Sequence, residues 1–161
     1  QKRDLTNKRP IWIYVGRVAV EKNIKAFLDL DLEGTKLIIG KGPDLDNLKK
    51  KFPNDVFLGE RTNGELASHF ASSDVFVFPS KTDTFGIVVL ESLACGTPVA
   101  AYPVPGPKDI LGGTKIDTLD NDLKASAMKA LKVSREDCLE FSKKYSWEET
   151  AKIFFDNISP N

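Results

Sequence analysis

Two cations near the start of the chain have the types and spacing to bind an anionic ligand. Arg17 follows Gly16 at the end of a short apolar run, and Lys22 lies in the first turn of the next predicted helix. Two fixed cations can neutralise a diphosphate without any metal ion. Each cation alone is typical of ordinary surface basicity. Because both follow the same predicted strand, we expect them to point into one crevice at the edge of a sheet.

Two carboxylates occur together in one later segment, FVFPSKTDTFGIVVLESLACGTPV at 76–99. Asp83 lies in a polar loop, and Glu91 lies on a predicted helix, Phe85–Ala94, whose other residues are nearly all apolar or small. A buried carboxylate there needs partners. A ribose diol would supply two hydroxyl donors, whereas the alternative is a salt bridge or backbone bond within the protein. Gly86 would let a phosphate or sugar oxygen approach the N–H groups of the first turn.

Short apolar runs alternate with amphipathic stretches, and this alternation predicts the elements that position these residues. The runs are nearly continuous, as in strands buried on both faces: Ile11–Val15, Leu37–Ile39, Val56–Leu58, Val75–Phe78 and Val99–Tyr102. The stretches predicted as helices are Val20–Leu30, Asp44–Phe52, Gly64–Ala71 and Phe85–Ala94. Strand alternating with helix indicates an α/β fold with a doubly wound, Rossmann-like parallel sheet. Later helices are predicted at Asn121–Leu131, after Ser134, and from Ser146 to about Asn157.

The composition indicates one ordinary globular domain. The chain has 161 residues, of which 41% are hydrophobic and 29% charged. Lys plus Arg and Asp plus Glu number 23 each, so the basic surplus of a nucleic-acid binder is missing. The apolar runs are far shorter than the roughly 20 residues that span a bilayer. With no secretory leader and two cysteines without metal-type spacing, we expect a cytoplasmic protein.

The same pattern suggests how the chain is organised. Residues 1–10 are polar and end in proline, which we interpret as the remnant of a linker. Residues 11–118 form the predicted Rossmann-like core. Residues 119–161 form a C-terminal helical tail of the same domain.

Other phosphate and metal signatures fail. No G-x-G-x-x-G occurs, and the P-loop-like spacing of Gly34 with Gly40 and Lys41 has one residue too many. Pairs of the form Asp-x-Asp occur three times, as chance would give in a chain with 23 acidic residues. His69, the only histidine, lies on a polar helix and is expected to be solvated or to cap it. We therefore expect neither a metal site nor a cofactor.

Four motifs together resemble a known family. They are GRVAVEKN at 16–23, GKGP at 40–43, FPS-x-x-D-x-FG-x-x-x-LES-x-x-CGTPV at 78–99, and FSKKYSWEETAKIFF at 141–155. In this order they are similar to the C-terminal domain of retaining GT-B glycosyltransferases. The resemblance covers about residues 11–155.

The resemblance implies roles for individual residues. Arg17 and Lys22 match the pair that holds the donor diphosphate, and Asp83 and Glu91 match the two acids of the family's E-x7-E motif. The first acid contacts the hydroxyls of the transferred sugar, and the second contacts the ribose. These roles make Arg17, Lys22 and Asp83 the catalytic candidates.

The other implied contacts come from loops. The backbone N–H groups of Thr84, Phe85, Gly86 and Ile87 would meet the sugar and phosphates. Gly16 would border the donor, and the loop Gly59–Thr62, with Arg61, would border the nucleobase.

Two departures from the family bear on specificity. Asp83 stands where the family usually has Glu, and its side chain is one methylene shorter, so its reach to the sugar changes. Residues Pro103–Asp109 (PVPGPKD) stand where relatives often carry a paired glycine and a Glu, and we expect this segment to be a loop that lines the crevice.

The resemblance implies the donor-binding half of a retaining, metal-independent hexosyltransferase. The donor would be a UDP- or GDP-sugar, and the acceptor would be bound by a missing N-terminal domain, so transfer by these residues alone is not expected. Peripheral membrane association of a longer enzyme is also compatible with the family. Two alternatives stay open: an epimerase-type GT-B relative, which needs additional acid–base groups, and a flavodoxin-like binding module, which would have acids where Gly16 and Arg17 stand.

Overall fold

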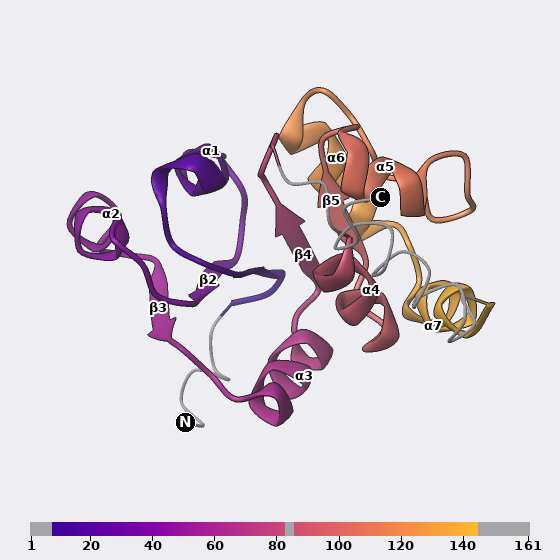
Figure 1. Cartoon of the computed structure of the whole chain (residues 1–161), viewed down its shortest axis with the longest axis horizontal. Coiled ribbons are helices and arrows are strands. Elements are labelled where there is room, and N and C mark those ends of the chain that lie inside the picture. Colours follow the sequence, from indigo (N-terminus) through magenta and orange to yellow (C-terminus); the bar gives the residue numbers. More distant parts are fainter. Residues whose placement is uncertain (1–7, 83–85, 145–161) are drawn as a thin grey trace, which may run out of the picture.

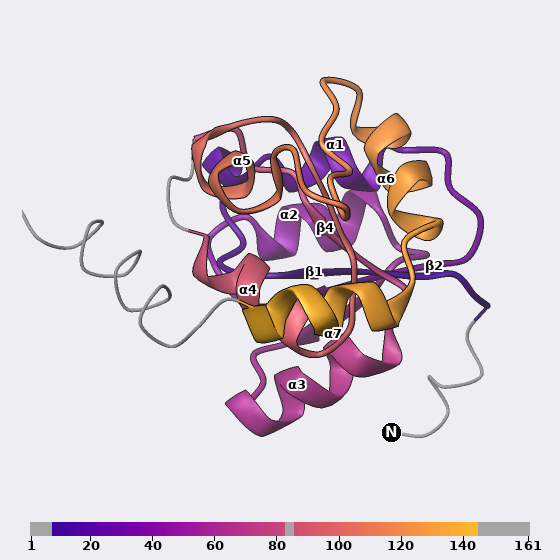
Figure 2. The same ribbon diagram turned by 90° about the vertical axis from the view of Figure 1, so that its right-hand side faces the viewer.

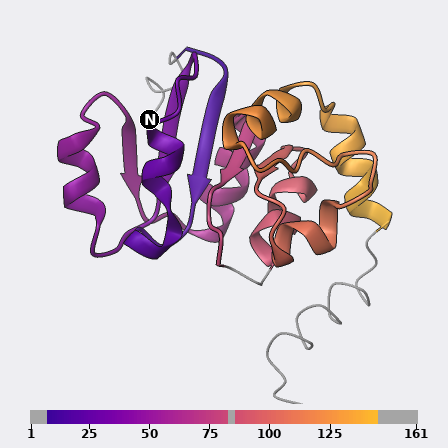
Figure 3. The ribbon, with the colours of Figure 1, turned by 90° about the horizontal axis from the view of Figure 1, so that it is seen from above.

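The computed structural model describes residues 8–82 and 86–144 and contains one parallel sheet. Its strands are β1 (Ile11–Val15), β2 (Thr35–Ile39), β3 (Val56–Gly59), β4 (Val75–Phe78) and β5 (Val99–Ala101). Their spatial order is β3-β2-β1-β4-β5, and every pairing is parallel. Figure 3 shows the arrows of the first strands, indigo to magenta, pointing the same way. All five predicted strands are confirmed, with small differences at their ends.

Helices cover both faces of the sheet, which confirms the doubly wound architecture. The helices are α1 (Ile24–Leu28), α2 (Leu45–Lys51), α3 (Asn63–Ser72), α4 (Ile87–Ala94), α5 (Pro105–Leu111), α6 (Leu123–Leu131) and α7 (Arg135–Lys144). In Figure 1, α1, α2 and α6 lie above the sheet, and α3, α4 and α7 lie below it. Figure 2 shows the same layers with β1 running horizontally between them.

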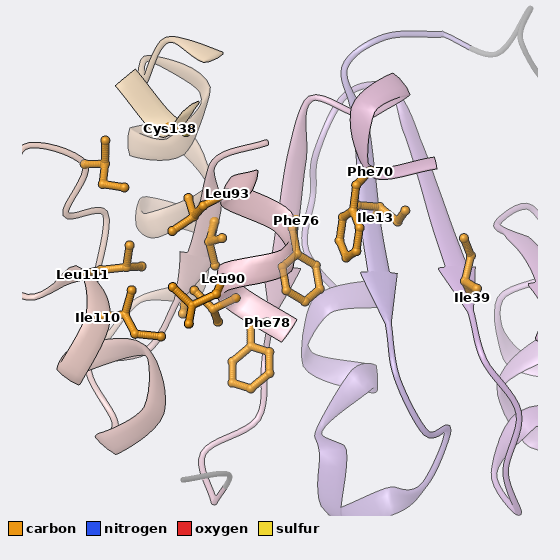
Figure 4. Close-up of a cluster of buried hydrophobic side chains, with 14 of the residues drawn as sticks. Ile13, Ile39, Phe70, Phe76, Phe78, Leu90, Leu93, Ile110, Leu111 and Cys138 are labelled. Atoms are coloured by element: carbon orange, nitrogen blue, oxygen red, sulfur yellow. The ribbon is translucent and has the colours of Figure 1, made fainter. Parts of the chain in front are cut away.

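The strand residues alternate between two apolar cores, one on each face. Trp12, with α1, α2 and α6, belongs to the first core, whereas Ile13 belongs to the second core under α3, α4, α5 and α7. In this second core the Phe76 ring contacts Phe70 and Phe78 edge-on, with centroids 5.3 and 6.0 Å apart (Figure 4). Strands buried on both faces require apolar residues at successive positions, which explains the continuous runs in the sequence.

The described part of the predicted helical tail is tied to the sheet and to α3 by side-chain hydrogen bonds. On α6, the Ser126 hydroxyl accepts from Ala101 N at 2.9 Å and donates to Thr118 O at 2.6 Å. On α7, Arg135 donates to Ser73 O at 2.7 Å and to Ala71 O at 2.6 Å. The Arg135 bonds satisfy carbonyls at the end of α3, and the Ser126 bonds satisfy backbone groups of β5 and of the segment before α6. The predicted helix from Ser146 lies outside the described residues.

Two secondary-structure predictions are wrong. The stretch Val20–Leu30 is not one helix: a 3-10 turn, η2 (Val20–Lys22), is separated from α1 by Asn23 in the left-handed conformation. The segment Pro103–Asp109 is not a loop, because α5 begins at Pro105. Proline is tolerated in the first turn of a helix, where its missing N–H is no loss, so P-G-P misled the sequence interpretation.

The connectivity places a switch point of the sheet between β1 and β4. The chain leaves β1 toward β2 on one side, and β4 pairs with β1 on the other side. Ligands of doubly wound sheets bind beyond the carboxyl ends of the strands at such a switch point. Within the described residues, no helix is long and apolar enough to cross a membrane.

Candidate functional site

The loops that follow β1 and β2 are joined by backbone hydrogen bonds. Gly16 N donates to Ile39 O at 3.0 Å, and Val18 N donates to Lys41 O at 2.9 Å. Asp44 N returns a bond to Val18 O at 3.1 Å. These bonds extend the β1–β2 pairing beyond the strands and fix the backbone around Arg17.

This close approach explains the glycines of GKGP. Gly40 has a φ of +144°, and a Cβ atom there would lie 1.8 Å from Gly16 O. A Cβ atom on Gly42 would lie 2.2 Å from Val18 O. The near match to a P-loop therefore has a packing cause: only glycine lets the two loops meet.

A pocket of about 480 Å³ opens at the carboxyl ends of β1, β2 and β3. Its polar lining includes Gly16, Arg17, Lys41, Glu60 and Arg61. The structure thus brings together three residues predicted for donor binding, Gly16, Arg17 and Arg61, from loops more than forty positions apart in the chain. Three cations and one carboxylate line it, and this excess of positive charge favours an anion.

Ion pairs hold the charged groups of the pocket at its surface. Arg17 Nη1 lies 2.7 Å from Glu21 Oε2, with the two side chains 57% and 56% exposed. Lys41 Nζ lies 3.4 Å from Glu60 Oε1. Exposed pairs are weak, so an incoming diphosphate can replace them. Sequence reasoning assigned no role to the charged groups of Glu21, Lys41 and Glu60, although Lys41 lies in the GKGP motif and Glu60 in the loop Gly59–Thr62. The i,i+4 spacing of Arg17 and Glu21 was the available signal for Glu21.

Lys22 ends η2 and is half-buried. Its backbone N–H donates to Ala19 O at 3.0 Å, which closes the turn. Lys22 does not line the pocket that contains Arg17, although both residues belong to the loop after β1. Whether the two cations share one ligand therefore stays a prediction.

Glu91 lies on an exposed side of α4. It makes no hydrogen bond or ion pair with any residue that the structure describes, so the internal salt bridge considered above is not found there. Its helical neighbours Ile87 and Val88 are half-buried. Partial burial of the carboxyl raises the pKa of Glu91. The premise of a buried carboxylate is wrong, but a carboxylate on an apolar surface without a described partner stays available to a ligand.

Gly86 precedes α4 and is buried, and a Cβ atom there would lie 2.2 Å from Ile110 Cδ1. Its missing side chain makes room for α5, which gives this glycine a packing role, and the predicted approach of a ligand to its N–H group stays a prediction. Ile87 is the first residue of α4. Asp83, Thr84 and Phe85 lie outside the described residues, so their predicted roles stay predictions.

His69 lies in the last turn of α3, as the sequence predicted, and its carbonyl accepts from Ser73 Oγ at 2.7 Å. Among residues 8–82 and 86–144, no group of three or more His, Cys, Asp or Glu side chains could hold a metal ion.

Comparison with protein families decides the relationship. The model of the family "Glycosyl transferases group 1" matches residues 1–144. The chain belongs to the group 1 glycosyl transferases. This group 1 chain is 40% identical over 109 residues to a sulfoquinovosyl transferase of Arabidopsis thaliana, covering 65% of this chain and 21% of that protein. It is 41% identical over 105 residues to a GDP-mannose-dependent alpha-mannosyltransferase of Mycobacterium tuberculosis, covering 64% of this chain and 28% of that protein.

Solved structures agree with the fold of this group 1 domain. It superposes on a sucrose-phosphate synthase of Thermosynechococcus elongatus with a TM-score of 0.72, at 24% identity, covering 92% of this chain and 44% of that one. The structural neighbours are GT-B enzymes, and the Rossmann-like sheet of this chain has the same fold as part of each of them. The match spans less than a third of either relative named above.

Proposed function

We propose that this chain is the nucleotide-sugar-binding domain of a retaining, metal-independent glycosyltransferase. The observation that carries the proposal is the cationic pocket at the carboxyl edge of β1–β3, where Gly16, Arg17 and Arg61 meet. Family membership supports sugar transfer as the reaction. The pocket lies beyond the carboxyl ends of the strands of a doubly wound sheet, where such folds bind their ligands, and this supports a nucleotide as the ligand.

The proposed chemistry uses the charge of the loop after β1. Negative charge develops on the leaving diphosphate as the acceptor hydroxyl attacks the sugar. Arg17 and Lys22 stabilise that charge more strongly in the transition state than in the ground state, which lowers the barrier. Glu21 holds Arg17 at 2.7 Å until the donor arrives and releases it to the diphosphate.

The remaining groups orient the donor. Glu91 accepts hydrogen bonds from the ribose, and Asp83 accepts them from the transferred sugar. The N–H groups of Thr84, Phe85, Gly86 and Ile87 face the sugar and phosphates. The donor is a UDP- or GDP-sugar, and a further N-terminal domain supplies the acceptor site. The limited share of each relative that this chain spans supports such a second domain.

Calorimetry with UDP-, GDP- and ADP-sugars tests the proposal. Each charge-assisted contact contributes roughly 1.5–3 kcal/mol, so Arg17→Ala and Lys22→Ala should each weaken binding about tenfold or more. Lys108→Ala, an exposed lysine on α5 outside this pocket, is the matched control and should bind as the wild type. Equal affinity in the wild type and both loop variants would contradict the assignment of Arg17 and Lys22 to donor binding.

Two further measurements test the finer claims. Chelation with EDTA should change donor affinity less than twofold if no metal takes part. For an intact protein that includes the acceptor domain, NMR of the product should show the anomeric configuration of the donor sugar. An inverted anomer, or binding that requires a divalent cation, would contradict these claims.

A further inference from the structure

Asn23 has an uncommon backbone conformation in the segment between η2 and α1, which follows β1. Its φ is +62°, and it is the only non-glycine residue with a positive φ in the described part of the chain. It ends η2, directly after Lys22, and precedes α1. Asparagine is among the few side chains that adopt the left-handed conformation at low cost. The turn that presents Lys22 therefore depends on this residue.

The Asn23 side chain links this turn to the loop after β4. Its Nδ2 donates to Pro79 O at 3.0 Å, a contact between residues 56 positions apart. Pro79 is buried and follows β4 directly. The next residue, Ser80, is also buried, and its Oγ accepts a hydrogen bond from Thr82 N at 3.3 Å. The amide of Asn23 thus holds the start of an ordered loop segment, Pro79–Thr82.

A second contact reaches the loop after β5. Burial raises the pKa of the Tyr102 hydroxyl, and the nearby Asn23 side chain acts in the opposite direction, so the two side chains lie close together. Lys81 Nζ lies 4.8 Å from the centre of the Tyr102 ring, within the range of a cation–π contact. The Asn23 side chain therefore bonds the loop after β4 and lies close to the loop after β5.

We propose that Asn23 is a positioning residue that fixes Lys22 relative to the carboxyl end of β4 through its bond to Pro79, with Tyr102 packed beside it. The inference rests on the proposed function, because the cation it positions is a proposed diphosphate ligand. Asn23 itself need touch no substrate. Its left-handed backbone sets the direction of Lys22, and its amide sets the distance between the loops.

A double-mutant cycle of Lys22→Ala and Asn23→Gly, with UDP and GDP as probes, tests the proposal. Glycine keeps the positive φ and removes the amide, so Asn23→Gly should weaken binding about fivefold. Because Asn23 acts through Lys22, the double variant should bind within twofold of Lys22→Ala alone. Independent, multiplicative losses would overturn the proposal, and so would unchanged binding in Asn23→Gly.

Two variants separate positioning from loss of stability. Tyr102→Phe keeps the ring beneath Lys81 and removes the hydroxyl, so a smaller loss of about twofold is expected. Asn47→Ala removes an exposed amide on α2 that donates to Asp44 Oδ1 at 3.0 Å, and it should bind as the wild type. Equal losses in Asn47→Ala and Asn23→Gly would contradict a specific role.

Amide hydrogen exchange tests the link between the loops without any nucleotide. In Asn23→Gly the N–H groups of Lys22 and Thr82 should exchange at least fivefold faster, while those of α2 stay unchanged. If the wild-type chain binds neither UDP nor GDP, the proposed function fails. The exchange rates would still show whether Asn23 links the loops after β1 and β4. Unchanged exchange at Thr82 would overturn the positioning role of Asn23.

Discussion

Two pockets of this domain differ in size and in charge. The pocket at the ends of β1–β3 measures about 480 Å³, and a second pocket beside α5 measures about 740 Å³. The larger one is lined by Lys108, Asp109 and Asp117 among other residues, so carboxylates outnumber cations there. The smaller one has the reverse balance. A diphosphate would be attracted to the smaller pocket and repelled by the larger. The charge of a pocket and its place in the fold therefore indicate the donor site better than its volume does.

The walls of the two pockets also differ in how they are built. The smaller pocket is walled by loops whose backbones touch, as Gly40 and Gly16 do. In the larger pocket, a Cβ atom on Gly113 would meet nothing within 4 Å. A Cβ atom on Gly112, also in the larger pocket, would lie 2.7 Å from Lys108 O. The contrast therefore holds between Gly40 and Gly113, and we expect a methyl group to disturb the smaller pocket at Gly40 and to be tolerated in the larger pocket at Gly113.

The largest expected effect in this comparison is that of Gly40→Ala. The new methyl group would meet Gly16 O at 1.8 Å, at a φ of +144°. Overpacking and backbone strain together should lower the free energy of unfolding by about 3 kcal/mol or more. The loops should separate, and nucleotide binding should be lost. Chemical denaturation and calorimetry on the same samples measure both.

Gly113→Ala is the matched control, because its φ of +73° carries strain but no clash. It should lower the free energy of unfolding by only about 1 kcal/mol and leave binding unchanged. If the two alanine variants unfold with equal free energies, the contrast between the pocket walls is wrong.

The smallest expected effect is that of Glu91→Gln, which separates stability from binding. Burial raises the pKa of Glu91, so the ionised carboxyl opposes folding above that pKa. This penalty falls as the pH drops through the folded pKa and is gone below the unfolded value of about 4.3. Thermal unfolding should show a slightly higher Tm for Glu91→Gln at pH 7 and equal Tm values near pH 3.

Nucleotide binding by Glu91→Gln should nevertheless weaken about fivefold, since a charged acceptor for the ribose becomes neutral. If Glu91→Gln is less stable and binds nucleotide as the wild type does, the proposed ribose contact is wrong and Glu91 has a structural role.

Continuous apolar runs predicted the sheet well, because strands buried on both faces leave no other pattern. The interruption of the helix at Asn23 could not be predicted, because an asparagine inside an amphipathic stretch gives no sign that it is left-handed. The helix from Pro105 could not be predicted either, because a proline followed by glycine and proline is typical of a loop. Local chain order placed Arg17 at the edge of the sheet. The Lys41–Glu60 pair depends on how β2 and β3 pair, and the filling of the space at Gly86 by Ile110 depends on the packing of α5, so neither has a local signal.

The most direct test is to titrate the isotope-labelled chain with GDP and UDP and follow its backbone amide resonances by NMR. Binding in the smaller pocket predicts the largest shifts at Gly16, Arg17, Gly40, Lys41 and Arg61, with the amides of Lys108, Asp109 and Gly113 unmoved. Shifts confined to the larger pocket beside α5, or none at millimolar nucleotide, would contradict the proposal that this edge of the sheet binds the donor.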